Sequence, residues 1–481
     1  MSDTQVNTGR ISLADVPQYA SQQERSHNNP ILGLVAICAG YFMVILDATI
    51  VTLATSNIQQ QLGAMVSDLQ WVLDGYTLVF AAILLTAGAL GDRLGSRRIF
   101  LLGMMLFTGS SVLCGLAPTL WVLQSARVIQ GIGAALQVPA SLTLLHQMFH
   151  DQKQRDRAIG LWGGIAGIAT AIGPVLGGLL VGLLGWRSIF FVNLPIGILA
   201  ILLTFRHIPA RPGLSQRGLD LFAQVAAMIA LGLLTLAIIE GNTWGWTSLP
   251  ILGSFAGSLV TMLLFLFIEQ RAHSPMLPLS LFRSPTFSAT NSVGLLINLG
   301  FYGQLLLINL FFQNILKYPP LLAGLALLPE GGVVTLTSML SGRVTAHVGP
   351  RLPMLVGLFV GACGFLLMLT IHTSTPYLLL CPMLITIGFG MSFTMPAMTT
   401  AAVASAPKER TGIASAVLNM SRQIGSVLGY ALLGSLVSGS AMFVSGLHVA
   451  MAISSATFFL ACLLTLLFVK ARPRTKAAVL K

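Results

Sequence analysis

The stretch GALGDRLGSRR (residues 88–98) follows a long apolar run, and GRVTAHVGPR (residues 342–351) repeats its pattern 254 positions further along the chain. A second pair of related stretches, IGPVLGG (residues 172–178) and IGSVLGY (residues 424–430), is separated by 252 positions. Two matches at nearly the same separation indicate that one structural plan is used twice. We therefore expect two halves that fold alike.

The composition indicates a chain that is mostly surrounded by lipid. Of the 481 residues, 55% are hydrophobic and only 8% are charged, whereas soluble domains carry about 25% charged residues. A helix needs about 20 apolar residues to cross a bilayer. Fourteen runs meet this requirement, near residues 31–56, 69–90, 99–117, 120–145, 158–183, 189–208, 219–240, 248–268, 286–314, 321–343, 352–372, 376–403, 411–437 and 447–469. The sequence therefore predicts an all-α membrane protein with 14 transmembrane helices.

The repeat divides these runs into regions. Residues 31–208 and 286–469 would form two pseudo-symmetric six-helix bundles, and residues 209–285 would form a linker that inserts two transmembrane helices between them. Residues 1–30 and the basic residues 470–481 would be tails, and the first tail has no cleavage-site pattern of a signal peptide. In many secondary transporters, repeated halves rock against each other around a site near the membrane midplane.

The basic charge of the chain follows its predicted topology. Of the 26 Lys and Arg residues, all but four lie in the tails or in loops on one predicted side of the membrane. The exceptions are Arg187 and Lys317 on the other side, and Arg127 and Arg422 within apolar runs. By the positive-inside rule, both termini lie in the cytoplasm and the chain is a multi-pass protein of the inner (plasma) membrane. The charge of +12 therefore requires no nucleic-acid partner.

Several motifs resemble those of one transporter family. The stretch GALGDRLGSRR closely resembles the loop signature of the major facilitator superfamily. ILDATIVTLA (residues 45–54), LQSARVIQGIGAA (residues 123–135) and WRSIFFVNLPIG (residues 186–197) resemble its fourteen-helix drug:proton antiporters, of the multidrug or antibiotic exporter type. The resemblance implies a proton-coupled secondary active transporter that exports small amphipathic compounds (drugs, antibiotics, lipophilic cations) by alternating access.

The loop signature implies a conformational latch at a membrane boundary. Its residues would be Gly88, Asp92, Arg93, Gly95 and Arg97. Gly88 and Gly95 would allow close packing and a sharp turn, and in the family the acid is thought to pair with nearby Arg and with a helix N-terminus of the other half. The second copy has Ala346 and His347 instead of the acid and base, so a latch would depend on the first copy. Ordinary positive-inside loop chemistry is the alternative.

Small residues in the fifth apolar run resemble the family's antiporter motif. The motif residues are Gly173, Pro174, Gly177 and Gly178. Small side chains let helices approach closely, and a proline removes one backbone donor, so we expect a bent, tightly packed helix. In exporters this motif is taken to seal the central cavity against leakage. A generic packing seam is the alternative.

Charges inside the apolar runs are the candidates for proton coupling, because a charge in lipid is costly unless it faces a partner or a cavity. Counting along the helices places Asp47 in the outer third of its run and Asp74 near an outer end. Arg127, Glu330 and Arg422 come near the midplane. Burial favours the neutral form of a carboxyl group, so Asp47 and Asp74 would couple protons. The resemblance implies that Arg127 assists them; purely structural roles are the alternative for all three.

Substrate-binding residues are predicted in the second half. Glu330 would suit a cationic substrate in an apolar cavity, and a proton site or a cap at the Gly331–Gly332 break is its alternative. The run 286–314 is unusually polar. From it we select Asn298, Tyr302 and Gln304 as further substrate contacts.

Two other classes of function compete with export. A carrier for a specific metabolite, working by symport, would share the fold and lack only the antiporter motif and the outer acids. A membrane enzyme or receptor is disfavoured because the sequence has no metal-ligand cluster, nucleophile elbow or phosphate loop. We therefore expect no enzyme activity, no metal and no cofactor, with the proton gradient as the driving force. The expected partners are a small-molecule substrate, protons and lipid, and the expected state is a monomer.

Overall fold

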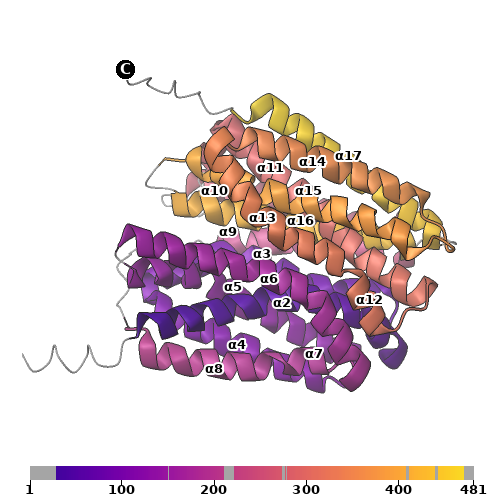
Figure 1. Cartoon of the computed structure of the whole chain (residues 1–481), viewed down its shortest axis with the longest axis horizontal. Helices are drawn as coiled ribbons and strands as arrows, with labels where there is room; N and C mark the ends of the chain where they lie inside the picture. The colour runs from indigo at the N-terminus through magenta and orange to yellow at the C-terminus, as the bar shows by residue number, and fades with distance from the viewer. Residues whose placement is uncertain are drawn as a thin grey trace, which may run out of the picture.

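The computed structural model describes residues 29–149, 151–210, 221–272, 277, 279–407, 411–438 and 443–470. Nearly all of these residues are helical, and the long helices lie side by side along one direction (Figure 1). The two predicted tails lie outside the described residues, apart from residues 29, 30 and 470.

The first half of the chain forms one helical bundle (Figure 1). Its helices are α2 (Pro30–Leu62), α3 (Val66–Leu94), α4 (Ser96–Leu116), α5 (Leu120–Met148), α6 (Gln152–Leu184), α7 (Ser188–Phe191) and α8 (Asn193–His207). Local sequence determines where several of them end. Asn29 accepts a hydrogen bond from the Ile31 amide at the start of α2, and Gly63 ends that helix with φ of 63°. Gly95 ends α3 with φ of 94°, a region that disfavours side chains with a Cβ atom.

The second half forms another bundle, and two helices precede it. These two are α9 (Leu221–Trp244) and α10 (Leu249–Arg271), which pack against each other, while α9 also contacts α3 and α16. The bundle contains η1 (Leu279–Arg283), α11 (Pro285–Leu310), η2 (Phe311–Ile315), α12 (Pro320–Ala326), α13 (Leu328–Val348), α14 (Arg351–Leu367), η3 (Met368–Thr370), α15 (Tyr377–Ala404), α16 (Thr411–Ser438) and α17 (Phe443–Phe468). The region boundaries predicted from the repeat remain predictions.

Each predicted apolar run coincides with a helix, or with two helical segments joined by a short turn. Within the described residues, twelve helices are long and apolar enough to cross a membrane, and a thirteenth is α3 if its two segments, bent by 54°, count as one span. The polar α16, which carries Arg422, does not meet this criterion. The predicted count of 14 is therefore not confirmed, although the helical, membrane-type fold is.

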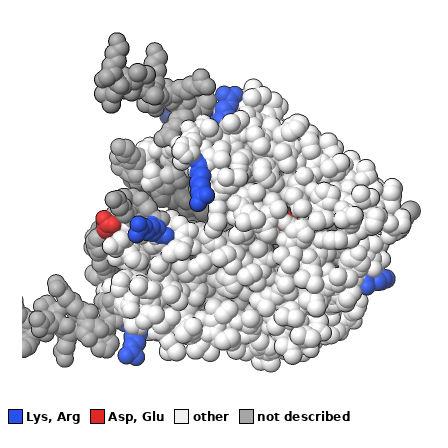
Figure 2. Space-filling model, in the orientation of Figure 1, with Lys and Arg blue, Asp and Glu red and all other residues white. Residues whose placement is uncertain are grey.

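One face of the molecule has a wide uncharged surface between its two ends (Figure 2). On the face shown in Figure 2, Lys and Arg side chains lie mostly at the end on the left, few lie at the opposite end, and the surface between them is nearly free of charge. Large exposed apolar side chains cover the outside of the helices, for example Leu183, Phe222, Leu249 and Leu378. This surface fits a hydrocarbon environment.

The two bundles meet closely at the end opposite the basic one. There α12 crosses to the first bundle and packs on α6 and α2 (Figure 1, right). Gln70 on α3 donates to the carbonyl oxygens of Tyr430 and Ala431 on α16, at 2.7 and 2.8 Å. Asn309 donates to the Thr52 carbonyl oxygen, and Gln313 donates to that of Leu53 at 3.0 Å. Hydrogen bonds therefore join the halves at this end.

The antiporter-type motif on α6 lies within this contact. A Cβ atom on Gly178 would lie 2.5 Å from the Pro320 carbonyl oxygen of α12. A Cβ atom on Gly177 would lie 2.9 Å from the Ile50 side chain of α2, and one on Gly173 would collide with Thr49. Pro174 faces Gly324 of α12 through its carbonyl oxygen. The motif therefore sets how closely α6 approaches both α2 and the other half.

We expect Gly178→Ala to destabilise the contact between the halves, because its methyl group must displace backbone atoms of α12. Overpacking of this kind costs about 1–3 kcal/mol. The matched control is Gly182→Ala, one turn further along α6, where the new methyl group would meet Leu321 only at 4.0 Å. Thermal unfolding of the purified proteins should show a lower midpoint for Gly178→Ala than for the control. Equal unfolding midpoints would contradict the close contact between Gly178 and α12.

Candidate functional site

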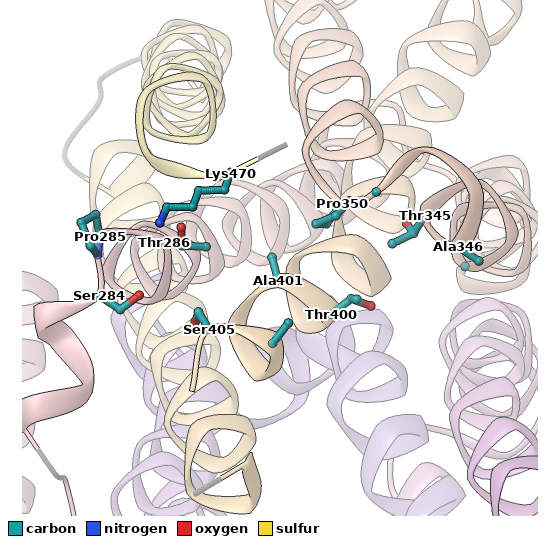
Figure 3. Close-up of a pocket in the computed structure, with 13 residues that line it drawn as sticks. Ser284, Pro285, Thr286, Thr345, Ala346, Pro350, Thr400, Ala401, Ser405 and Lys470 are labelled. Carbon is teal, nitrogen blue, oxygen red and sulfur yellow. The ribbon is translucent and has the colours of Figure 1, made fainter. Parts of the chain in front are cut away.

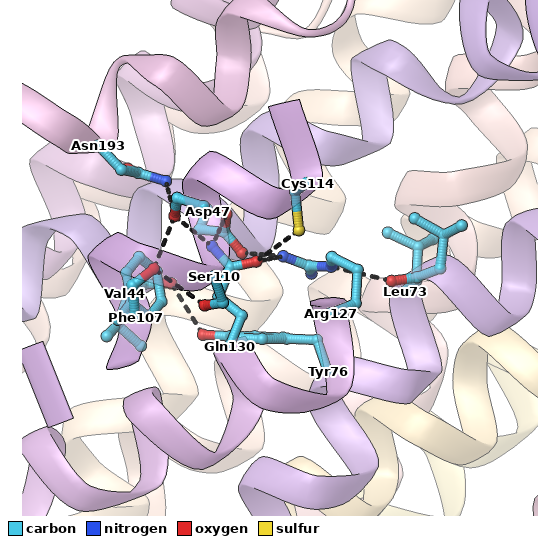
Figure 4. A network of polar contacts seen from close by, with 12 residues as sticks. Val44, Asp47, Leu73, Tyr76, Phe107, Ser110, Cys114, Arg127, Gln130 and Asn193 are labelled. Atoms are coloured by element: carbon cyan, nitrogen blue, oxygen red, sulfur yellow. Dashed lines mark hydrogen bonds and ion pairs between the residues drawn. The ribbon is translucent and has the colours of Figure 1, made fainter. Parts of the chain in front are cut away.

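A buried ion pair occupies the centre of the first bundle. Arg127 on α5 and Asp47 on α2 form it with their side chains 1% and 0% exposed (Figure 4). The guanidinium group also donates through Nε to the Val72 carbonyl oxygen at 3.0 Å and lies over the Tyr76 ring, 4.3 Å from its centroid. Each of the two charges is therefore compensated by a buried partner and not by solvent.

A shell of polar side chains completes this pair. Gln130 accepts from Arg127 Nη1 at 2.7 Å and donates to Asp47 Oδ1 at 3.0 Å and to Ser111 Oγ at 2.9 Å. Asn193 on α8 donates to the same Ser111 oxygen at 3.2 Å. Gln130, Ser111 and Asn193 were not among the site residues predicted from the sequence. Only Gln130 had a usable signal, since it lies one helical turn after Arg127 and therefore on the same face.

The predicted depths of the ion pair were wrong in one respect. Asp47 was expected in the outer third of its run and Arg127 near the midplane, but their contact places them at one level. Arg127 is the eighth residue of α5, so it lies near the start of that helix and not at its middle. The predicted depth of Arg127 is therefore the one that differs.

Asp74 on α3 is buried differently. Its side chain is 0% exposed, and neither carboxyl oxygen has a hydrogen-bond partner among the described residues. The hydroxyl group of Tyr430, from the other half, lies within electrostatic range of both Asp74 and Arg127. The Tyr430 ring in turn packs edge-on against Tyr302, with 5.9 Å between ring centroids. Asp74 is therefore an unpaired acid beside the contact between the halves.

Glu330 on α13 is a second unpaired acid. It is 3% exposed, and its carboxyl oxygens lack hydrogen-bond partners among the described residues. The Gln304 amide of α11 lies close enough to interact with it electrostatically but makes no hydrogen bond itself. Glu330 also packs against Gly388 of α15. The structure thus brings two predicted substrate residues, Glu330 and Gln304, together.

The other two predicted substrate residues have different surroundings. Asn298 donates to the Gly294 carbonyl oxygen of its own helix at 2.7 Å, so its amide supports α11. Tyr302 belongs to the tyrosine contact with Tyr430 beside Asp74. The four predicted substrate residues therefore do not share one set of contacts.

The loop signature forms the turn between α3 and α4. Asp92 and Arg93 are exposed at the end of α3, and Arg97 Nη2 donates to the Phe205 carbonyl oxygen of α8 at 2.7 Å. The close packing expected at Gly88 is not observed, because a Cβ atom there would meet only Pro139, at an ordinary 3.9 Å. Gly95 has the backbone that a sharp turn requires.

A cavity of about 800 Å³ opens at the basic end of the second bundle (Figure 3). The second copy of the loop signature lines it through Gly342, Thr345, Ala346, Gly349 and Pro350, together with the ends of α11 and α15 and with Lys470. None of its lining residues is a predicted site residue. This cavity is separate from the buried acids.

Comparison with known proteins identifies one family and several related sequences. The sequence profile of the Major Facilitator Superfamily matches residues 37–430. The chain is 37% identical over 459 residues to a methylenomycin A resistance protein of Bacillus subtilis (strain 168), covering 95% of this chain and 98% of that protein. It is 39% identical over 413 residues to the multidrug resistance protein Stp of Mycobacterium tuberculosis (strain CDC 1551 / Oshkosh), covering 85% and 76%.

A third relative is the tetracenomycin C resistance and export protein of Streptomyces glaucescens, with 35% identity over 406 residues, 84% of this chain and 75% of that protein. Among solved structures, a bacterial homologue of the human lysosomal transporter Spinster has a TM-score of 0.67 at 17% identity, over 92% of this chain and 97% of that one. This last similarity establishes the fold.

We expect Asp47→Asn to destabilise the protein by about 3–5 kcal/mol, because it leaves the Arg127 guanidinium buried without its counter-charge. Adding Arg127→Gln should restore part of that loss. A double-mutant cycle of unfolding free energies, measured on the purified variants, tests this. Strictly additive losses would mean that the two charges do not stabilise each other.

Proposed function

The chain belongs to the Major Facilitator Superfamily, and from this membership we propose that it exports small amphipathic compounds in exchange for protons by alternating access. It is a multi-pass membrane transporter whose relatives are named for resistance to antibiotics and drugs. The established relationships therefore support drug efflux and not an enzyme activity. Proton coupling and the exchange mechanism are our inference from its buried charges.

We place the basic end of the molecule in the cytoplasm, since loops rich in Lys and Arg stay on that side. Both termini then lie in the cytoplasm, and the membrane is the inner (plasma) membrane. In this orientation the end closed by α6, α12, α3 and α16 is the outer end. Substrate would enter the path from the cytoplasm or the inner leaflet, as an exporter requires. We expect the monomer to be the working unit.

Asp74 is the observation that carries the proton-coupling proposal. A carboxylate without a partner, away from water, is strongly disfavoured relative to its neutral form. In this arrangement we therefore assign a proton to Asp74, which has no partner, whereas Asp47 forms an ion pair with Arg127. Separation of α3 from α16 at the outer end would expose Asp74 to external protons. Its proton would be released inward when the halves rock.

Arg127 has a supporting role in this scheme. Its guanidinium charge lies within range of Tyr430, which is also within range of Asp74. Movement of α16 relative to α3 would change these distances together. We propose that Asp47 and Arg127 thereby sense the state of the interface, with Gly178 and its neighbours keeping the outer end closed.

Glu330 and Gln304 are the proposed substrate contacts of the second half. A cationic group that reaches the unpaired Glu330 carboxyl group would favour its ionised form, and the two charges would compensate each other on binding. Tyr302 would contribute an aromatic surface near the same path, and Asn298 would stabilise α11 through its hydrogen bond to the Gly294 carbonyl oxygen. The driving force is the proton gradient, without a cofactor.

We expect Asp74→Asn to abolish gradient-driven export while substrate binding stays largely intact. Everted vesicles, scanned with dyes, quaternary ammonium compounds and antibiotics, measure this with and without a proton gradient. The matched control is Glu240→Gln on α9, since Glu240 accepts a hydrogen bond from Trp71 at 2.9 Å, an interaction that the glutamine can keep. Export by Asp74→Asn at the level of the control would remove Asp74 from the mechanism.

For Glu330→Gln, we expect weaker transport of cationic compounds than of neutral compounds of similar size. The amide keeps the shape of the side chain but loses its charge, so only the electrostatic part of recognition should fall. Apparent affinities in the same vesicle assay provide the comparison. An equal loss for both kinds of compound would indicate a structural or proton-binding role.

A further inference from the structure

Arg422 on α16 is a half-buried cation within the helical bundle that the proton scheme does not use. Its side chain is half-buried and packs over Gly294 of α11. Nη1 donates to the Asn419 side chain at 3.0 Å, whereas Nε is buried without a hydrogen-bond partner among the described residues. Among the described residues, no Asp or Glu forms a salt bridge with Arg422, whereas Asp47 forms one with Arg127. The charge of Arg422 is therefore uncompensated.

Aromatic side chains from both halves surround this cation. The hydroxyl groups of Tyr41 on α2 and Tyr302 on α11 lie within electrostatic range of Arg422. The Tyr41 ring stacks on Trp162 of α6, with 3.8 Å between centroids and 10° between planes. The three aromatic side chains are partly exposed, so part of each ring remains accessible to a ligand. Because α2 and α6 belong to one half and α11 and α16 to the other, this group lies at the interface that alternating access must open.

The chemistry of this group favours a particular ligand. A guanidinium group offers planar, paired donors that match a carboxylate, and such charge-assisted bonds are stronger than neutral ones. A stacked pair of aromatic rings offers a flat apolar surface for an unsaturated ring. An unpaired cation inside a membrane protein is costly, and a bound anion would compensate it.

We propose that Arg422 binds an anionic oxygen of the transported compounds, and that the Tyr41–Trp162 pair packs against their unsaturated ring system. The substrate class then includes flat amphipathic carboxylates in addition to lipophilic cations. This inference rests on the proposed export path between the halves. Arg422 alone would then determine the specificity for the acidic group.

The test uses purified full-length protein without a proton gradient and three naphthalene probes that differ only in their head group. These are 2-naphthoate, 2-naphthamide and 2-naphthylmethylammonium, with binding measured by equilibrium dialysis. The wild-type protein should bind naphthoate more tightly than the neutral naphthamide. Arg422→Gln should weaken naphthoate binding about 10- to 100-fold and change binding of the other two probes by less than about threefold.

Three further variants make the result specific. Lys317→Gln removes one positive charge from an exposed loop and should leave all three affinities unchanged. Arg422→Lys keeps the charge but not the paired donors, so its naphthoate affinity should be intermediate, which also covers the case that Arg422→Gln does not fold. Trp162→Leu should weaken all three probes alike, because stacking does not depend on the head group.

Either of two results would overturn the proposal: a wild-type preference for the amide over the naphthoate probe, or equal loss of all three probes in both Arg422 variants. Neither result would affect the export proposal, which depends on the gradient-driven assay with Asp74→Asn. Conversely, loss of proton coupling in that assay would leave the binding result standing. The two inferences can therefore fail separately.

Discussion

The cost of holding a charge away from water governs this protein more than any other interaction. The apolar helices can accept a charge only when a partner, a ligand or a proton compensates it. Asp47 and Arg127 compensate each other, and Gln130 and Tyr76 complete their surroundings. Asp74, Glu330 and Arg422 have no opposite charge beside them among the described residues. We propose that these three side chains are the ones that bind a proton or a charged group of the substrate.

Two of these unpaired charges lie at the interface between the halves, where the proposed alternating access requires movement. Asp74 lies beside the hydrogen bonds of Gln70 to α16, and Arg422 lies between aromatic side chains of both halves. Both positions would change their surroundings if the halves separate, whereas Asp47 and Arg127 both belong to one half. In the proposed mechanism, a charge pair within one half and unpaired charges along the interface would let binding events bias which end is open. Glycines on α6 permit the close approach on which the closed end depends.

Much of the fold could be predicted from the sequence, because long apolar runs have few structural solutions in lipid. The positions of the helices and the membership of the family were predicted correctly from these runs and from the quoted motifs. The count of 14 could not be confirmed, because α16, which was predicted from the apolar run 411–437, contains Arg422 and does not meet the hydropathy criterion for a membrane span. The site was only partly predictable. The unpaired state of Asp74 and the partnership of Asp47 with Arg127 depend on contacts between helices far apart in sequence.

The exchange of substrate for protons is the central claim, and luminal pH in proteoliposomes tests it most directly. The protein is reconstituted with a pH-sensitive dye inside, and a gradient of the best-transported compound is applied from outside without a pre-existing pH difference. Exchange predicts that the lumen becomes alkaline as substrate enters and protons leave, and that Asp74→Asn loses this signal. Acidification of the lumen, which symport would produce, or substrate entry without a pH change would contradict the account.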